Sequence, residues 1–420
     1  MLSSRDSSPS FAYTIQEKST WSSSMADLFT RNSVPLMDVQ CNWDDVIRKP
    51  GAKFWVSCKR RGEGTVHGTL CCPSDGTHID NCFTLTSVRQ RAITVDCSGA
   101  QYSATFVCPT KTLQLHDGKL LDMDVSPSGA LGVCASDNGR LWIWDTDTGE
   151  NRRILEGHVM DVLTCHFFPS GMVVLSSGMD MRLRIWSVQD GSCPRTLSGH
   201  CGAVTETTMI DRGRNIISVS KDGTARLWDC GSGQCIDTVA NLDCPINSCS
   251  LASSALACAS AKEKPPEPEC GTSDKLLLLA CEDGSARAYD VSSRKLLSTF
   301  GVGNQPVTTA AFISEDGILC GCEDGNVVKF DLRKTSESIS SYTIGAGAVC
   351  SLLYMGDGRV VTGHGDGMCA CWNLQHFSNS LVRLTGPDID HITAVRNAAG
   401  NVYCSCRDGN VRRYSISDFT

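Results

Sequence analysis

The sequence lacks a long apolar run and any excess of positive charge. No stretch of 18 apolar residues occurs, and the N-terminus has neither the basic start nor the apolar segment of a secretory leader. Its 38 lysines and arginines stand against 46 aspartates and glutamates, which gives a formal net charge of −8. A chain with this charge has no general attraction for phosphate backbones or anionic lipids. We therefore expect a soluble protein of the cytoplasm, and also of the nucleus, that binds neither nucleic acid nor membranes.

Charged residues are also scarce, at 20% of the chain against 41% hydrophobic residues, which favours a packed fold over disorder. Cysteine, in contrast, is abundant. The 25 cysteines are an odd number that cannot pair completely, and a chain of 420 residues does not need disulfides to hold its core. In a reducing compartment we expect them to act mostly as small buried apolar residues.

Composition and patterning divide the chain into three regions. Residues 1–36 contain ten serines and only scattered apolar residues, which predicts a disordered serine-rich extension. Residues 37–104 begin with a short helix after Asn42, its expected N-cap, and continue as a small antiparallel β domain. The five expected strands of this domain are residues 54–58, 65–72, 82–88, 93–97 and 102–107, separated by turn residues. Residues 105–420 form a repeat.

Each copy of the repeat ends in an aromatic residue. These are Trp144, Trp186, Trp228, Tyr289, Phe330, Trp372 and Tyr414, spaced by 41 or 42 residues except for one interval of 61. The longer interval predicts an exposed insert at about residues 256–274 of the fourth copy. Six residues before each aromatic stands an Asp or Asn, followed by Gly in every copy except the second, which has Met181. An Asp-Gly pair between two strand-like runs predicts a tight hairpin turn in each copy.

The first three copies also carry a histidine 28 residues before the aromatic, at positions His116, His158 and His200. This pattern resembles the WD40 repeat. The resemblance implies an all-β chain in which a seven-bladed β-propeller, with four antiparallel strands per blade, follows the small β domain. Because the chain stops after the third strand of the seventh copy, we expect residues 105–115 to supply the missing outermost strand.

In WD40 proteins the matching positions form a buried hydrogen-bond chain, the structural tetrad. The resemblance assigns to it His116, Ser136, Asn138 and Trp144 in the first copy, His158, Asp180 and Trp186 in the second, and His200, Ser220, Asp222 and Trp228 in the third. The third set has the composition of a catalytic Ser-His-Asp triad. We reject that interpretation because the same offsets recur in the first copy, and because no Gly-x-Ser-x-Gly nucleophile turn accompanies it.

Cysteine pairs and glycine-rich stretches are the remaining chemical motifs. The Cys-x-Cys pairs are Cys320-Cys322, Cys369-Cys371 and Cys404-Cys406. Their spacing is one residue short of the usual zinc motif, and alternation puts both members of a pair on one face of a strand. His364 stands at the tetrad-serine offset of the sixth copy and needs no metal. The stretch Gly301-Val-Gly-Asn304 precedes neither Lys-Ser/Thr nor a helix, as a phosphate loop would. We therefore expect no metal, no cofactor and no enzymatic activity.

A rigid propeller leaves recognition to the loops on its two rims. The residue before each turn Asp or Asn is expected on the rim that carries the histidine loops. The candidate partner-binding residues of this rim are Asp137, Asp161, Lys221, Glu282, Glu323 and Arg407. Among them, Glu282 and Glu323 predict an acidic sector, opposite a more basic one, that favours a basic partner. The alternative that these residues only solvate the surface stays open for each of them.

A narrower resemblance is carried by residues 155–162, 211–215, 226–230 and 406–414, which are similar to the proteasomal ATPase-associated factors, a family of WD40 proteins. It implies a monomeric, non-catalytic assembly chaperone. Such a protein binds the C-terminal regions of ATPase subunits in the base of the proteasome 19S regulatory particle and regulates its association with the 20S core. Two alternatives stay open, a scaffold for a signalling complex and a substrate receptor for a ubiquitin ligase. No copy reads Trp-Asp-x-Arg, which disfavours the receptor.

Overall fold

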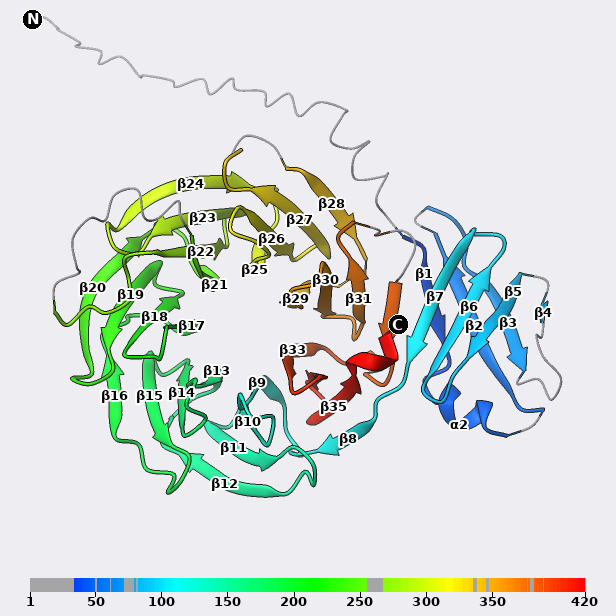
Figure 1. Cartoon of the computed structure of the whole chain (residues 1–420), viewed down its shortest axis with the longest axis horizontal. Helices are drawn as coiled ribbons and strands as arrows, with labels where there is room; N and C mark the ends of the chain where they lie inside the picture. The colour runs from blue at the N-terminus through cyan, green and yellow to red at the C-terminus, as the bar shows by residue number, and fades with distance from the viewer. Residues whose placement is uncertain are drawn as a thin grey trace, which may run out of the picture.

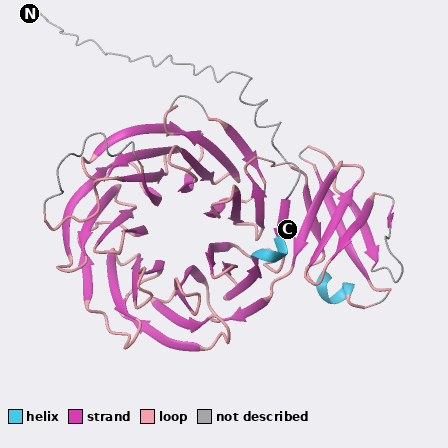
Figure 2. Cartoon of the chain, viewed as in Figure 1, coloured by secondary structure: helices cyan, strands magenta, loops and turns pink. Residues whose placement is uncertain are grey.

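The structure is a computed structural model that describes residues 34–49, 51–60, 62–71, 79–80, 82–254, 267–334, 338–344, 347–375, 377, 381–387 and 389–419. These residues form almost only β-strands (Figure 2), with one short helix, α2 (Trp43–Ile47), and a final 3-10 turn, η1 (Ile416–Phe419). Neither of the two is long and apolar enough to cross a bilayer. The predicted disordered extension lies outside the described residues up to position 33, and its last residue begins strand β1 (Leu36–Val39).

Seven sets of four antiparallel strands stand around a central axis like the blades of a propeller (Figure 1), which confirms the predicted fold class. From the inner to the outer strand, the first blade is β9 (Leu120–Val125), β10 (Leu131–Ser136), β11 (Arg140–Asp145) and β12 (Asn151–Glu156). The second is β13 (Val162–Phe167), β14 (Val173–Gly178), β15 (Arg182–Ser187) and β16 (Arg195–Ser198). The third is β17 (Val204–Ile210), β18 (Asn215–Ser220), β19 (Thr224–Asp229) and β20 (Gln234–Asn241).

The other four blades repeat this order. The fourth is β21 (Ile246–Ser253), β22 (Lys275–Cys281), β23 (Ser285–Asp290) and β24 (Lys295–Gly301), and the fifth is β25 (Val307–Phe312), β26 (Gly317–Cys322), β27 (Asn326–Asp331) and β28 (Ser340–Thr343). The sixth is β29 (Val349–Tyr354), β30 (Arg359–His364), β31 (Cys369–Asn373) and β32 (Leu381–Leu384). The seventh is β33 (Ile392–Ala398), β34 (Asn401–Cys406), β35 (Asn410–Ser415) and β8 (Lys111–Gln114).

The two ends of the repeat region meet in the seventh blade. Strand β8 pairs antiparallel with β35, so that a segment from before the first blade supplies the outermost strand of the last, as predicted. The inner strand β33 then packs against β9 of the first blade. Across this contact, Arg396 donates a hydrogen bond to the Asp122 carboxylate at 3.0 Å.

The hydrophobic core lies between neighbouring blades rather than within one sheet. Alternating residues of each strand face the next blade, as the period of two along a strand requires. Val133 and Ile143 of the first blade, for example, pack with Cys165 and Trp186 of the second. The stack of apolar faces makes the ring a rigid frame for the loops at its rims.

The hairpin turns between second and third strands explain the Asp-Gly signature. The turn glycines of six blades have φ between 77° and 84°, a left-handed backbone that glycine adopts without steric cost. In the second blade the same place is taken by Met181, whose φ is 61°. The hairpin therefore forms there despite a residue that disfavours it.

The N-terminal β domain has two sheets. One is β1, β2 (Lys53–Lys59) and β3 (Val66–Cys71), and the other is β4 (Ile79–Asp80), β5 (Phe83–Val88), β6 (Ala92–Cys97) and β7 (Tyr102–Val107). The five predicted strands correspond to β2, β3, β5, β6 and β7, whereas β1 and β4 carry no strong sequence signal. Asn42 precedes α2 but makes no side-chain capping hydrogen bond. The predicted capping role was therefore wrong, and the Asn42 side chain instead accepts a hydrogen bond from Gln40 at 2.6 Å.

The N-terminal domain is joined to the sixth blade through β7. This strand pairs in parallel with β32, which makes one eight-stranded sheet across both regions (Figure 1). The expected boundary between residues 104 and 105 falls inside β7. The Trp43 indole donates to Thr385 Oγ1 at 3.1 Å, and Arg383 donates to the carbonyl oxygen of Met37 at 2.6 Å. One apolar core continues from the domain into the fifth and sixth blades.

The insert of the fourth blade joins β21 to β22 and so leaves the propeller on the face opposite the histidine loops. Its residues 255–266 are outside the described ranges. The described remainder is less exposed than predicted, because it packs on the third and fourth blades. The Cys270 amide donates to Asn215 Oδ1 at 2.6 Å, Glu269 pairs with Arg294, and Thr272 is buried.

Candidate interaction surface

Complete tetrads occur in the second and third blades. In the second, His158 Nδ1 lies 2.8 Å from Asp180 Oδ2, and its Nε2 lies 2.7 Å from Ser176 Oγ. The Trp186 indole donates to the same hydroxyl at 2.8 Å. Each bond joins groups from different strands, so the chain ties the loop before the inner strand to the hairpin turn and to the third strand. The face on which these loops lie is called the His-loop face below.

The third blade repeats the arrangement with Ser218, not the predicted Ser220. His200 Nε2 lies 2.7 Å from Ser218 Oγ and the Trp228 indole donates to Ser218 at 2.8 Å, while His200 Nδ1 lies 2.9 Å from Asp222 Oδ2. Ser220 accepts the backbone N–H of Asp222 at 3.0 Å instead. Both serines lie on the same face of β18, so alternation could not distinguish them.

In the first blade the predicted tetrad is split. Ser136 Oγ donates to Asn138 Oδ1 at 2.6 Å, and Asn138 Nδ2 lies 3.2 Å from His116 Nε2. Trp144 does not join this chain, because its indole donates to Cys134 Sγ at 3.2 Å. Cysteine stands where the other two blades have the tetrad serine, and its thiol is a weak acceptor.

In the sixth blade, as in the third, the predicted tetrad position lies two residues too far along the strand. The tetrad-serine position there is Thr362, not His364, and the two side chains are 3.0 Å apart. Burial lowers the pKa of His364, so its ring is neutral. The Trp372 indole nitrogen is buried without a hydrogen-bond partner among the described residues.

The electrostatics of the third-blade tetrad favour an ionised aspartate beside a neutral histidine. Burial alone would raise the pKa of Asp222, but hydrogen bonds from Thr224, Cys201 and His200 bring it well below its usual value. Burial, with the charge of Arg226, lowers the pKa of His200 although Asp222 acts to raise it. Because both ring nitrogens are held by neighbours, the histidine is oriented as a structural link.

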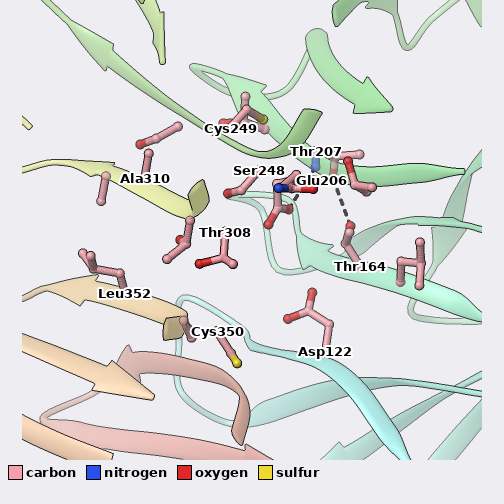
Figure 3. Close-up of a pocket in the computed structure, with 18 of the residues that line it drawn as sticks. Asp122, Thr164, Glu206, Thr207, Ser248, Cys249, Thr308, Ala310, Cys350 and Leu352 are labelled. Atoms are coloured by element: carbon pink, nitrogen blue, oxygen red, sulfur yellow. Dashed lines mark hydrogen bonds between the residues drawn. The ribbon is translucent and has the colours of Figure 1, made fainter. Parts of the chain in front are cut away.

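An ionic cluster lines one side of the central channel, a cavity of about 430 Å³ (Figure 3). His166 Nε2 lies 2.8 Å from Glu206 Oε1, and Arg396 bonds to Asp122. Asp122 also accepts the amide N–H of Cys165 at 2.9 Å, which joins the first blade to the second. Across the channel from Asp122 and Glu206, the lining includes small or apolar residues such as Ala310 and Leu352.

The sequence reasoning missed this cluster. Burial alone would lower the pKa of His166, but the hydrogen bond and charge of Glu206, with Asp122 and Asp124, raise it to about 9. A charged residue inside an innermost strand was the available signal, since such a position usually holds an apolar side chain.

The predicted rim residues lie on the His-loop face, but their charges are not arranged as expected. Lys221 Nζ lies 3.1 Å from Glu282 Oε2, so the supposed basic and acidic sectors contact each other between the third and fourth blades. This hydrogen bond lowers the pKa of Glu282. Glu323 and Arg407 are exposed, and neither makes an ion pair within the described residues. The predicted separation of an acidic sector, with Glu282 and Glu323, from a basic sector that includes Lys221 was therefore wrong.

Asp137 and Asp161 are half-buried and belong to the loops of the first and second blades. The amide N–H of Asp137 donates to the carbonyl oxygen of Lys119, and the carbonyl oxygen of Asp161 accepts from Met179 at 2.9 Å. Their carboxylates make no ion pair among the described residues, so they are available to a partner.

Comparison with known proteins places the chain in a family. The model of the WD domain, G-beta repeat, matches residues 107–145, 149–187 and 191–229. Proteasomal ATPase-associated factor 1 of Bos taurus is 44% identical over 389 residues, which cover 90% of this chain and 98% of the relative. The chain belongs to the proteasomal ATPase-associated factor family of WD40 proteins. The Homo sapiens relative of the same name is 42% identical with the same coverage. Probable proteasomal ATPase-associated factor 1 of Dictyostelium discoideum is 35% identical over 413 residues, 91% of this chain and 96% of the relative.

The three repeats matched by the WD40 model are those that carry a histidine loop. In this member of the proteasomal ATPase-associated factor family, blades four to seven keep the sheet and the turn without a histidine at that position. The alignment with the Bos taurus relative covers 90% of the chain and therefore most of the N-terminal domain and of the propeller. The chain is thus a WD40 scaffold of a family whose named members are associated with a proteasomal ATPase.

The cysteines of this family member are placed mostly in the interior. All six members of the Cys-x-Cys pairs are buried in β26, β31 or β34. Burial raises the pKa of Cys322 and of Cys371 to about 12, so both remain protonated thiols. One group among the described residues has metal-ligating atoms within reach of each other, namely Cys244, Cys281 and Asp283. The Asp283 carboxylate is already bound by Arg287 and Ser285, and burial raises the pKa of Cys281 to about 12.

Proposed function

We propose that this protein is a non-catalytic assembly chaperone that binds ATPase subunits of the proteasome 19S regulatory particle base through their C-terminal regions. The observation that carries the proposal is the match to proteasomal ATPase-associated factors over nine-tenths of the chain. In this proposal the protein acts as a monomer in the cytoplasm and the nucleus. By holding the ATPase region that faces the 20S core, it regulates the association of the two particles.

The structure supports a binding role through the distribution of its polar groups. The histidines, serines and aspartates that have the composition of a catalytic site are held in tetrads that join strands and loops. The His-loop face carries groups that can contact another protein, since Glu323, Asp137 and Asp161 have no ion-pair partner among the described residues. These acids favour basic groups on the ATPase, mainly through the association rate.

Affinity capture from cell extract tests the proposal. A tagged copy of the full chain should recover ATPase subunits of the 19S base, identified by mass spectrometry, without stoichiometric 20S core subunits. Recovery of intact proteasomes would contradict a chaperone role, and recovery of ubiquitin-ligase adaptors in place of ATPases would replace it with a receptor role.

Two charge-reversal variants on opposite faces test which face binds the ATPase subunit. Glu323→Lys on the His-loop face should weaken binding to the recovered ATPase subunit several-fold and reduce its dependence on salt. Glu315→Lys is the matched control, because Glu315 is an exposed acid of the same blade in the loop between β25 and β26, on the opposite face. Equal effects of the two variants would remove the His-loop face from the proposal.

A further inference from the structure

Four exposed apolar side chains gather on the His-loop face of the second blade. Val159 and Met160 lie in the loop before β13, and Met179 and Met181 flank the turn aspartate. Their exposed fractions are 78%, 51%, 41% and 42%. We call these four residues the methionine patch. Single exposed apolar residues are ordinary, but a contiguous group of them marks an interaction site.

The tetrad of the second blade holds the methionine patch together. Asp180, between Met179 and Met181, binds His158 Nδ1 at 2.8 Å and also accepts the backbone N–H of Val159. The Met179 amide donates to the carbonyl oxygen of Asp161 at 2.9 Å, one residue beyond Met160. The two loops that carry the patch are therefore fixed to each other, and its side chains are presented on a rigid base.

Met181 occupies a position that its side chain disfavours. Its φ of 61° lies in the left-handed region, where the corresponding residue of every other blade is glycine. The Met181 side chain is 42% exposed, so a large part of its surface is accessible to a partner. A residue held in a sparsely populated backbone region is a candidate for a functional role.

Acidic groups border the patch. Asp137 lies next to it, because the turn that follows it brings Gly139 close to the carbonyl oxygen of Met160. Asp161 follows Met160 directly. Asp137 and Asp161 make no ion pair among the described residues, and neither do the neighbouring Lys119, Arg182 and Arg184. The surface thus has an apolar centre and two carboxylates without an ion pair at its edge.

We propose that the methionine patch binds an amphipathic segment of an ATPase subunit, with aliphatic side chains on the methionines and a lysine or arginine beside Asp137 and Asp161. This inference rests on the proposed function and gives it a location and a chemistry. Methionine suits such a role, because its flexible thioether side chain adapts to the shape of an apolar partner. The neighbouring carboxylates select a partner whose apolar residues are flanked by positive charge.

The test compares variants of the full chain for affinity to the purified recombinant ATPase subunits of the 19S base. Met181→Gly gives the turn the residue of the other six blades, so its melting temperature should stay the same or rise. Binding should nevertheless weaken about five-fold or more. Met160→Ser should weaken binding similarly. Met172→Ser is the control, because Met172 is 54% exposed in the loop between β13 and β14, on the opposite face of the same blade.

The outcomes separate the two proposals. If the wild-type protein binds an ATPase subunit and Met181→Gly and Met160→Ser bind it with unchanged affinity, the methionine patch is not the docking site, although the proposed function survives. If Met172→Ser weakens binding as much as they do, the patch is likewise excluded. If the wild-type protein binds none of the subunits, the proposed function fails and the partner assigned to the patch fails with it.

Discussion

The third and sixth blades have the same four-stranded arrangement, but their buried tryptophans make different contacts. In the third, the buried Trp228 donates its indole N–H to Ser218, which continues through His200 to Asp222. In the sixth, Trp372 is equally buried and its indole nitrogen has no partner among the described residues. It packs instead against Tyr342 and Phe377, with ring centroids 5.0 and 5.2 Å away.

This difference separates what builds a blade from what positions its loops. Aromatic packing and the Asp-Gly turn suffice for four paired strands, since the sixth blade forms without a tetrad. The tetrad adds a link from the inner parts of the sheet to the His-loop face. The tetrads therefore fix the loops of blades two and three relative to their sheets. The methionine patch is formed by the loops of blade two.

The largest expected effect on stability comes from replacing the buried tryptophan of each blade by phenylalanine, which removes the indole N–H. Trp228→Phe should lower the free energy of unfolding by about 2–3 kcal/mol, because it leaves a small cavity and deprives Ser218 of a hydrogen bond. Trp372→Phe should cost about 1 kcal/mol less, since it removes a buried donor that has no partner. Chemical denaturation of both variants measures the difference. Equal losses would mean that the tetrad bond contributes nothing to stability.

A second effect, of similar or smaller size, is expected from the ionic cluster, in which His166 of the second blade contacts Glu206 of the third. The pKa of His166 is raised to about 9 in the folded protein, above its ordinary value of about 6.5. Its stabilising contribution is therefore complete below pH about 6.5 and is lost as the pH rises through about 9. The loss should be on the order of 1–3 kcal/mol.

Denaturant unfolding of the wild-type protein and of His166→Gln between pH 6 and 10 checks this prediction. The variant keeps Glu206, Asp122, Asp124 and Arg396, so only the titration of the imidazole is removed. The wild-type curve should slope downward and the variant should follow a flatter line. Parallel curves would show that His166 does not titrate differently in the folded and unfolded states.

The repeat made most of the propeller predictable from the sequence. A period of 42 residues with a turn signal and an aromatic in phase determines the number of blades, the place of each hairpin and the need for β8. Less could be said where two positions share a face. Ser218 and Ser220 are both inward on β18, and only the reach of the Trp228 indole selects the first.

Contacts between distant segments left no comparable signal. The parallel pairing of β7 with β32 joins residues far apart in the chain, so the expected boundary at residue 104 cut a strand. The Lys221–Glu282 pair crosses from one blade to the next, which a list of rim charges could not reveal. The methionine patch was visible only in part, as Met181 in place of glycine, because its exposure and its fixed loops depend on the folded ring.

Hydrogen–deuterium exchange of the full chain, alone and bound to purified ATPase subunits of the 19S base, tests most directly whether the His-loop face is the binding surface. Binding should slow exchange in residues 157–161 and 178–182, and in the corresponding loops of neighbouring blades. The loop of residues 168–172 on the opposite face should be unaffected. Protection confined to that opposite face, or to the N-terminal domain, would contradict recognition through the His-loop face.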